Sequence, residues 1–348
     1  MRNILCVTLI ALLGGCTSTS VTEKYQDKRN DIINVKDKVI EFETGNVLIG
    51  SVSRLYMSNK CLLIADHKSV DKQIHIFNKN DFSYLTSIGN FGEGPEEITV
   101  MGCLAIDEAH HQLYVSDHAK QKIFSYDMDS VMVDSLYKPQ VKTAMNETLF
   151  PSEYQYINDT LSIAVLIKPT STSTFNQFLG RWNMNTGEMI PMKYTHPDIQ
   201  KKRITFAASE KAGIYVECYT RHDLMTICSL DGELLYNIYG PDWDGGNGNK
   251  LQSFGTVMIG NDKIFVSYCG EDYARDSFPT KILVFDLEGN YLKTLETGYK
   301  ISDCCYDSFN NRIILSLNDV VQFAYLDIDG IISVSYTHLR AHETEADL

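Results

Sequence analysis

A glycine-rich stretch, SIGNFGEGPEE (87–97), contains residue types that could bind a phosphate group. A phosphate-binding loop needs a strand before it, a helix after it and backbone amides that point at the anion. Here the glycine spacing does not match G-x-G-x-x-G, Pro95 lacks an amide hydrogen, and Glu96 and Glu97 would repel phosphate. We therefore predict a connector between two strands rather than a nucleotide site.

Three histidines could contribute to a metal site. His67 and His118 each follow an apolar, strand-like run that ends in an aspartate, and His222 lies in a comparable place further along the chain. The aspartates, Asp66 and Asp117, could contact a ligand, or they could fix the following turn by accepting hydrogen bonds from its backbone amides. Whether the imidazoles can meet depends on the fold that positions them.

A second glycine-rich stretch, DWDGGNGN (242–249), contains the oxygen donors Asp242, Asp244 and Asn247. Its spacing departs from that of a calcium-binding loop and it lacks the closing glutamate. We therefore predict a plain connector, with calcium binding as the alternative. Trp243 lies among glycines and polar residues. Its ring could stack against a sugar or a protein partner, or it could pack onto its own sheet.

A charged loop, EDYARDSFP (271–279), could contact a ligand or could pair its charges internally. No Ser-His-Asp signature and no G-x-S-x-G motif occurs, so no catalytic residue and no metal ligand is predicted. The candidate ligand-binding residues are Trp243, Asp242, Asp244, Tyr273, Arg275, His118 and His222.

The elements that must position these residues repeat along the chain. Six short apolar runs end at residues 66, 117, 165, 218, 268 and 317, at intervals of 51, 48, 53, 50 and 49 residues. One strand-like run precedes each of them and two more follow. In four repeats the last two runs are joined by turns that contain glycine, which supplies the positive φ of tight hairpins: NTGE, LDGE, LEGN and IDGI.

Four strands in each of six repeats predict an all-β fold, a six-bladed β-propeller with four antiparallel strands per blade. One small sheet cannot bury both of its faces, whereas radial packing buries each sheet between two neighbours. We predict the propeller over residues 36–335, with residues 39–42 as a strand that closes the ring on the last blade. A two-sheet sandwich, the alternative, would not generate a constant period.

The predicted fold places the candidate residues. The turns between the second and third strands of each blade share one face with the connectors between blades, and we call this the loop-rich face. Gly89 and Gly240 are three repeats apart, so the two glycine-rich connectors should lie on opposite sides of the central axis. His67 and His222 should likewise lie in opposite blades, too far apart for metal bonds of about 2 Å. We expect any ligand on this face, near the mouth of the central channel.

Two stretches resemble known families. LYVSDHAKQKIFSYD (113–127) resembles the repeat of NHL-like and TolB-like six-bladed propellers. IGNFGEGPEE (88–97) is similar to the G-x-G-x-G-P-G-E loop of propeller lipoproteins from Bacteroidetes, from which it differs at Asn90 and Glu96. The resemblance covers most of the mature chain and implies the fold. Some propellers of similar build are hydrolases or lyases with a metal in the central channel.

The N-terminus resembles that of a bacterial lipoprotein. Arg2 precedes an apolar run over 4–13, and LLGGC (12–16) resembles a lipobox. The resemblance implies a signal peptide over 1–15, a lipid on Cys16 and a lipidated tether over 16–35. It places the protein in the cell envelope, at the periplasmic face or in the outer membrane, and in contact with the membrane through its anchor only.

Composition narrows the partners. The net charge of −14 disfavours nucleic acid, because phosphate binding needs a dense basic surface. Seven of the nine cysteines follow Cys16, and an odd, scattered set is not a disulfide framework. His338 and His342 have a spacing that suits a metal, but residues 336–348 resemble translated adapter DNA found at the ends of unrelated reading frames. We predict a non-native or disordered tail there and exclude it from functional reasoning.

The sequence thus predicts a monomeric, lipid-anchored binding module that presents its loop-rich face to a glycan, a peptide or an envelope protein. The alternative is a propeller hydrolase or lyase with a metal in the central channel.

Overall fold

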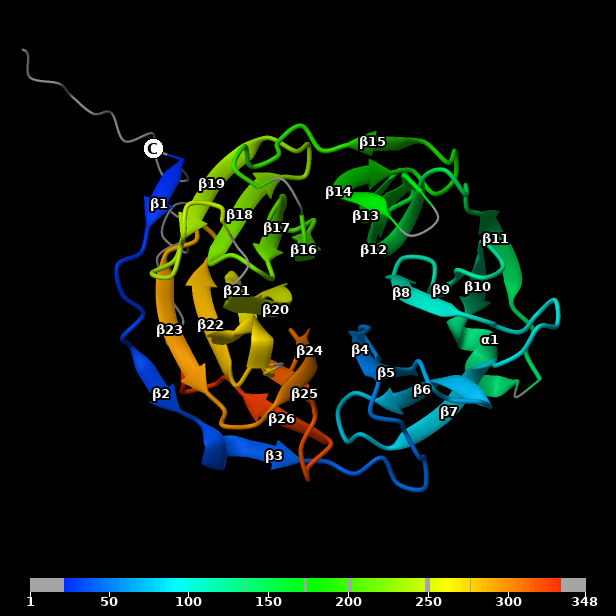
Figure 1. The fold of residues 1–348 in the computed structure, drawn as a ribbon. Helices are drawn as coiled ribbons and strands as arrows, with labels where there is room; N and C mark the ends of the chain where they lie inside the picture. Colours follow the sequence, from blue (N-terminus) through cyan, green and yellow to red (C-terminus); the bar gives the residue numbers. More distant parts are fainter. Residues whose placement is uncertain are drawn as a thin grey trace, which may run out of the picture.

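The structure is a computed structural model that describes residues 22–134, 136–171, 174–199, 202–247, 251–275 and 277–332. The predicted signal peptide, the lipidation site Cys16 and the predicted tail over 336–348 lie outside these residues. The described residues form six small sheets arranged radially around one axis (Figure 1). The six-bladed propeller predicted from the repeat is confirmed.

The first three blades each contain four antiparallel strands, which follow one another from the axis outwards. Blade 1 contains β4 (Ser53–Met57), β5 (Cys61–Asp66), β6 (Lys72–Asn78) and β7 (Tyr84–Asn90). Blade 2 contains β8 (Met101–Asp107), β9 (Gln112–Asp117), β10 (Lys122–Asp127) and β11 (Gln140–Ala144). Blade 3 contains β12 (Phe150–Asn158), β13 (Leu161–Pro169), β14 (Phe175–Trp182) and β15 (Met189–Pro191).

The other three blades also use strands from the N-terminal part of the chain. Blade 4 contains β16 (Ile204–Ser209), β17 (Ile214–Tyr219), β18 (Leu224–Ser229), β19 (Leu234–Tyr239) and β1 (Glu23–Tyr25). Blade 5 contains β20 (Leu251–Gly260), β21 (Lys263–Asp272), β22 (Lys281–Asp286), β23 (Tyr291–Glu296) and β2 (Ile32–Asn34). Blade 6 contains β24 (Ile301–Asp307), β25 (Arg312–Leu317), β26 (Phe323–Asp327) and β3 (Val39–Glu41).

The core lies between the blades. Among the described residues, a separate hydrophobic cluster fills each of the six interfaces between neighbouring sheets. Strand β5 shows how one strand serves two interfaces: Leu62 faces blade 6, whereas Leu63 faces blade 2. Successive side chains of a strand point to opposite faces of its sheet, so this strand needs apolar residues at every position. The uninterrupted apolar runs of the repeat follow from this burial.

The turns NTGE, LDGE and LEGN join the last two strands of their blades, as the sequence predicts. The prediction is wrong for IDGI, because no strand follows this turn within the described residues and β3 is the fourth strand of blade 6. Gly187, Gly232, Gly289 and Gly330, the glycines of NTGE, LDGE, LEGN and IDGI, have φ values of 77°, 85°, 80° and 73°. In blade 2 the corresponding segment differs from the prediction. A short helix, α1 (Met128–Val133), follows β10, with the carboxylate of Asp127 accepting a hydrogen bond from the Ser130 amide at 2.7 Å. The fourth strand of that blade therefore begins only at Gln140.

The N-terminal segment binds the outer edges of three blades. β3 pairs antiparallel with β26, which confirms the predicted closing strand. β1 and β2 pair parallel with β19 and β23, where they cover backbone groups that would otherwise be exposed at a sheet edge. The prediction of a tether over residues 16–35 is therefore wrong for residues 23–34, because these residues belong to the folded propeller (Figure 1).

Two further features concern membrane and redox chemistry. Within the described residues, the helices are single turns or little more, and none has the length and hydropathy to cross a bilayer. The seven cysteines in this part of the chain are all buried as free thiols. They pack as small apolar side chains between the blades.

Candidate functional site

Six of the seven predicted ligand-binding residues lie in one sector of the loop-rich face. Asp242, Trp243 and Asp244 belong to the connector from blade 4 to blade 5, and His222 lies in the turn between β17 and β18. Tyr273 and Arg275 form the short 3-10 helix η2 (Tyr273–Arg275) of blade 5. The guanidinium of Arg221, next to His222, lies 4.0 Å above the Tyr273 ring and so links the two loops.

Trp243 is half-buried and packs onto its own blade. Its ring centroid lies 5.0 Å from that of Tyr239, 5.7 Å from His196 and 5.9 Å from His222. Burial lowers the pKa of both imidazoles, so both rings are neutral at pH 7. Of the two interpretations of Trp243, packing against its sheet is the one that this geometry supports.

The charged groups of this sector are mostly engaged with the protein itself. The carboxylate of Asp242 accepts a hydrogen bond from the Tyr268 hydroxyl at 3.3 Å, and Asp244 lies 3.8 Å from Nδ1 of His222. Arg275 pairs with Glu271 at 3.1 Å, with both side chains exposed. An exposed pair of this kind contributes about 0–1 kcal/mol. Internal pairing, one of the two interpretations of this loop, is what the structure shows.

Buried aspartates hold the connectors in place. Asp66 accepts hydrogen bonds from the amides of Lys68 at 2.9 Å and Gly50 at 2.7 Å. Asp117 accepts from Ala119 at 3.0 Å and Thr99 at 2.8 Å. Each carboxylate therefore fixes the turn that follows it and the connector that precedes its blade. The turn-forming interpretation of both aspartates is confirmed.

The glycine-rich stretch 87–97 binds a cation of its own chain. The ammonium group of Lys120, from the turn between β9 and β10, donates hydrogen bonds to the carbonyl oxygens of Gly94 at 2.5 Å and Glu97 at 2.6 Å. The Glu97 carboxylate accepts a hydrogen bond from the Gly94 amide at 2.8 Å. Carbonyl oxygens, rather than amides, thus converge in this loop. The predicted connector is confirmed, and its polarity is opposite to that of a phosphate site.

A second group of polar residues, which the sequence did not reveal, lies on the innermost strands. Arg54 of β4 pairs with Glu153 of β12 at 2.8 Å, and the two side chains are 47% and 40% exposed. Water therefore reaches the axis side of these strands. Burial opposes the charge on Arg54, but Glu153 and neighbouring acidic groups outweigh it and raise the pKa of Arg54. Burial raises the pKa of Asp303, which also interacts with Arg54.

Side chains on the inner strands also bind the free edge of a neighbouring blade. Asp303 accepts a hydrogen bond from the Leu55 amide at 2.8 Å and another from the Thr256 hydroxyl at 2.7 Å. The side-chain nitrogen of Gln155 donates a hydrogen bond to the Ala208 carbonyl oxygen at 2.9 Å, and the side-chain oxygen of Gln155 accepts one from the Ala208 backbone amide at 2.8 Å. Innermost strands have no further strand to pair with, so these contacts satisfy their backbone groups and fix the polar side chains around the axis.

Two imidazoles approach this polar group from the loop-rich face. Burial, together with the charge of Arg54, lowers the pKa of His67, and burial lowers the pKa of His118, which interacts with Glu153. The Nε2 atoms of both rings are buried and have no hydrogen-bond partner. A Cβ on Gly102 would lie 2.5 Å from Nε2 of His118, so glycine is needed for the ring to approach β8. We call Arg54, Glu153, Asp303, His67 and His118 the axial site.

Of the seven predicted ligand-binding residues, only His118 belongs to the axial site, which also contains His67, one of the three histidines considered for a metal site. Arg54 and Glu153 were not predicted as site residues, because each is a single charged residue in a strand that shows no other sign of a site. A charged residue in the middle of an inner strand, as in SRLYM and SEYQY, is the signal that could have identified them. The predicted separation of His67 from His222 follows from their positions in blades 1 and 4.

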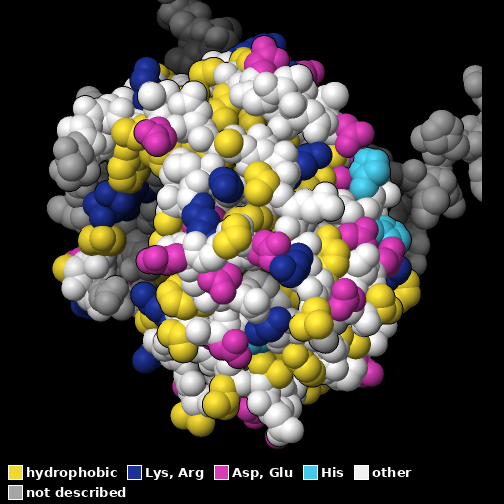
Figure 2. All heavy atoms as spheres, turned by 90° about the vertical axis from the view of Figure 1, so that its right-hand side faces the viewer, with side chains coloured by type: hydrophobic (Ala, Val, Ile, Leu, Met, Phe, Trp, Pro, Cys, Tyr) yellow, Lys and Arg dark blue, Asp and Glu magenta, His cyan; other side chains and the backbone are white. Residues whose placement is uncertain are grey.

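The outer rim is mixed in character. Figure 2 shows the side of the ring that lies to the right in Figure 1, where acidic and basic side chains alternate with small groups of hydrophobic ones. This rim contains exposed apolar side chains such as Val133 and Leu136. No single sign of charge dominates the view.

Comparisons with known proteins concern the fold. Residues 18–176 match the model of a family named DUF5128, described as a 6-bladed beta-propeller. No curated protein matches the sequence of this chain. A solved structure from Bacteroides fragilis, described as an inferred exported protein, is 13% identical with a TM-score of 0.55, over 84% of this chain and 87% of that one.

Two further solved structures are similar. A member of the DUF4221 family from Bacteroides vulgatus is 11% identical with a TM-score of 0.56, over 86% of this chain and 98% of that one. The β-propeller domain of Cps50 (Swd1) from Myceliophthora thermophila is 10% identical with a TM-score of 0.52, over 82% and 98%. The family match and the sheet topology together show that this chain has an all-β, six-bladed propeller fold built on four antiparallel strands per blade.

Proposed function

We propose that this protein is a lipid-anchored binding protein of the bacterial cell envelope, and that it holds a polar, uncharged group of a glycan or a peptide at the axial site. The observation that carries the proposal is the Arg54–Glu153 pair, whose side chains are 47% and 40% exposed on the axis side of the inner strands. The imidazoles of His67 and His118 interact with these two charges. Together these side chains offer both hydrogen-bond donors and acceptors to a ligand.

The charges of the axial site support an uncharged ligand. Arg54 is balanced by Glu153, and the imidazoles are neutral because burial lowers their pKa values. An anion would find no net positive charge at this site in a chain with a net charge of −14, whereas hydroxyl and amide groups can both donate to and accept from neutral imidazoles.

The envelope location rests on two supports. The lipobox-like LLGGC ends at Cys16, and a structurally similar protein is described as an inferred exported protein. The folded chain adds a geometric consequence. Only five residues lie between Cys16 and Thr22, whose carbonyl oxygen accepts a hydrogen bond from the Asn237 amide at the outer edge of blade 4. The six steps from Cα to Cα span at most about 20 Å, so a lipid on Cys16 would hold the rim of blade 4 close to the bilayer.

Ligand binding is tested with a glycan and peptide array. The soluble chain starts at residue 17, so that β1 is retained, and each ligand found is measured again with Glu153→Gln and His118→Asn. We expect affinity to fall at least tenfold in both variants, and to stay within twofold in Tyr273→Ala. Loss of binding in Tyr273→Ala or Trp243→Ala, with Glu153→Gln unaffected, would move the site to the sector of blades 4 and 5.

Anchoring is tested separately in cells. We expect the parent protein in the membrane fraction and Cys16→Ala in the soluble fraction. A parent protein that is soluble contradicts the anchor without affecting the array result, so the two parts of the proposal fail independently.

A further inference from the structure

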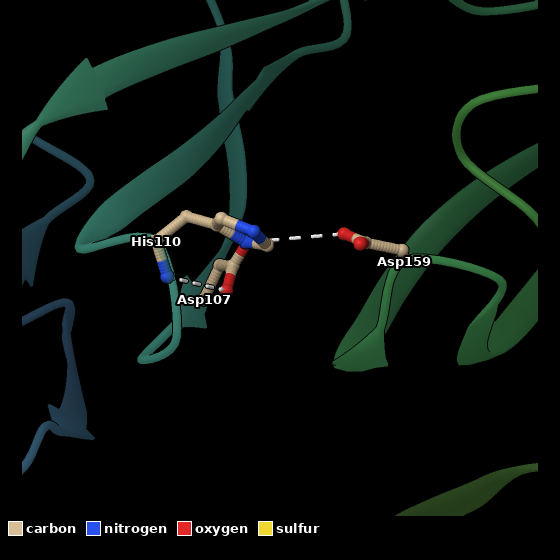
Figure 3. Close-up of side chains that lie close together, drawn as sticks. All are labelled: Asp107, His110 and Asp159. Carbon is tan, nitrogen blue, oxygen red and sulfur yellow. Dashed lines mark hydrogen bonds and ion pairs between the residues drawn. The ribbon is translucent and has the colours of Figure 1, made fainter.

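Two turns on the face opposite the loop-rich face bring three metal-binding side chains together. Asp107 ends β8, His110 lies in the turn that follows, and Asp159 lies in the turn between β12 and β13. One donor atom from each residue lies within 4.8 Å of the other two, and within the described residues this is the one group with three such donors. Figure 3 shows the imidazole of His110 pointing at the Asp159 carboxylate across the boundary between blades 2 and 3.

The distances suit a small ion. Nδ1 of His110 lies 2.9 Å from Oδ2 of Asp107 and 3.8 Å from Oδ1 of Asp159. An ion with bonds of about 2.1 Å holds its ligands about 3.0 Å apart at right angles and about 3.4 Å apart in a tetrahedron. The two measured distances bracket these values. His110 and Asp159 are 57% and 63% exposed, so small side-chain rotations can bring both atoms to bonding distance.

The donor set combines one fixed ligand with two adjustable ones. Asp107 is buried, and its carboxylate also accepts hydrogen bonds from the amide of His110 and the hydroxyl of Tyr114, each at 3.2 Å. Two carboxylates balance the charge of a divalent cation, and an imidazole favours zinc-like ions over magnesium or calcium. We propose that Asp107, His110 and Asp159 bind a divalent transition-metal ion of the Zn²⁺ type, which joins blades 2 and 3 with water in the remaining positions. This site is independent of the proposed ligand site on the other face.

Protons compete with the metal for this site. The hydrogen bond to Asp107, together with the charges of Asp107 and Asp159, raises the pKa of His110, and Lys142 opposes this effect. Tyr114 and Tyr156 face the same carboxylates through their hydroxyl groups. A metal ion must displace the proton from Nδ1, so affinity should rise with pH until the imidazole is neutral.

The test is a calorimetric titration of the full chain with ZnCl₂. The protein is purified without a polyhistidine tag, and His338→Ala and His342→Ala are introduced throughout to remove the other closely spaced histidines. We expect one Zn²⁺ per chain at pH 7.5, with an affinity that falls at least tenfold in His110→Asn and in Asp159→Asn. Zn²⁺ should raise the melting temperature of the parent protein but not of these variants.

A neighbouring pair provides the matched control. Nδ1 of His111 lies 2.7 Å from Asp129, and both side chains are exposed, but no third donor joins them among the described residues. His111→Asn should therefore leave the Zn²⁺ affinity within twofold of the parent value. Three results overturn the proposal: no heat of binding at 1 mM ZnCl₂, the same affinity in His110→Asn as in the parent, or equal losses in His110→Asn and His111→Asn. Circular dichroism checks that each variant is folded.

Discussion

The two glycine-rich connectors of the propeller occupy equivalent positions half a turn apart, and they are stabilised in different ways. Residues 91–100 join blade 1 to blade 2 and enclose the ammonium group of Lys120, which comes from the turn between β9 and β10 of blade 2. Residues 240–247 join blade 4 to blade 5 and are held by Asp223, which accepts a hydrogen bond from the Asp242 amide at 3.2 Å. Asp223 in turn pairs with Arg29 at 2.8 Å.

The two connectors differ in the sequence separation between the stabilising cation and its partner. Lys120 is 26 residues from Gly94, whereas Arg29 is 194 residues from Asp223. The first connector is therefore stabilised by neighbouring blades alone. The second depends on the N-terminal segment that runs around the outside of blades 4, 5 and 6. Equivalent repeats thus place the two connectors at equivalent positions, but different interactions stabilise them.

The largest effect is expected from Arg29→Met. The side chains of Arg29 and Asp223 are 8% and 0% exposed, and removal of one partner of a buried ion pair leaves an uncompensated charge. We expect the free energy of unfolding to fall by about 3–5 kcal/mol in urea titrations at pH 7. Lys28→Met, which changes an exposed cation one residue away, should have an effect within about 0.5 kcal/mol. A similar loss in both variants would contradict the role of the ion pair.

The same variant predicts a dependence on pH. Burial raises the pKa of Asp223 above its usual value despite the nearby Arg29, and the loss of Arg29 should raise it further. A carboxyl group whose pKa is raised by folding stabilises the fold below its unfolded pKa, and this contribution is lost as the pH rises. The deficit of Arg29→Met should therefore be largest at pH 7 and shrink towards pH 4. It should be independent of pH in the double variant with Asp223→Asn.

An intermediate effect is expected from Lys120→Met. This change removes charge-assisted hydrogen bonds to two carbonyl oxygens, and we expect a loss of about 2–3 kcal/mol in the free energy of unfolding. Hydrogen exchange should increase over residues 91–100 and stay unchanged over residues 240–247. Lys138→Met is the control, because Lys138 pairs with Glu96 of the same connector in an exposed salt bridge worth less than about 1 kcal/mol. An equal increase of hydrogen exchange over both connectors in Lys120→Met would show that the two connectors are not stabilised independently.

The smallest effect concerns the imidazoles that contact Trp243. Burial lowers the pKa values of His196 and His222 in the folded state, so their contribution to stability is present above the unfolded pKa and is lost as the pH falls through the folded one. We expect the fluorescence of Trp243, measured in a Trp182→Phe background, to report loosening of this connector between pH 7 and pH 5. His222→Gln should make this pH dependence weaker, because one of the two imidazoles with a lowered pKa is then absent. If the pH dependence of Trp243 fluorescence is unchanged in His222→Gln, titratable groups other than His222 cause it.

The repeat determined the architecture because burial imposes it locally. A strand that lies between two neighbouring sheets needs apolar residues on both of its faces, and this produces runs such as CLLIAD at a constant interval. The glycines of the hairpin turns are visible for a similar reason, since their positive φ values exclude most other residues. The closing strand was predicted on different grounds, from the segment before the first repeat that the six repeats leave unassigned.

Only the tertiary structure decided which residues meet. The strands over residues 23–34 have no repeat and no strong apolar pattern, because they are short edge strands stabilised by pairing with blades more than 200 residues away. Arg54 and Glu153 come from different blades and meet only because the inner strands surround one axis. Asp107, His110 and Asp159 meet for the same reason at the other face. Burial of a strand depends on its own residues, and the sequence therefore records it, whereas a site formed by several blades depends on how the ring closes.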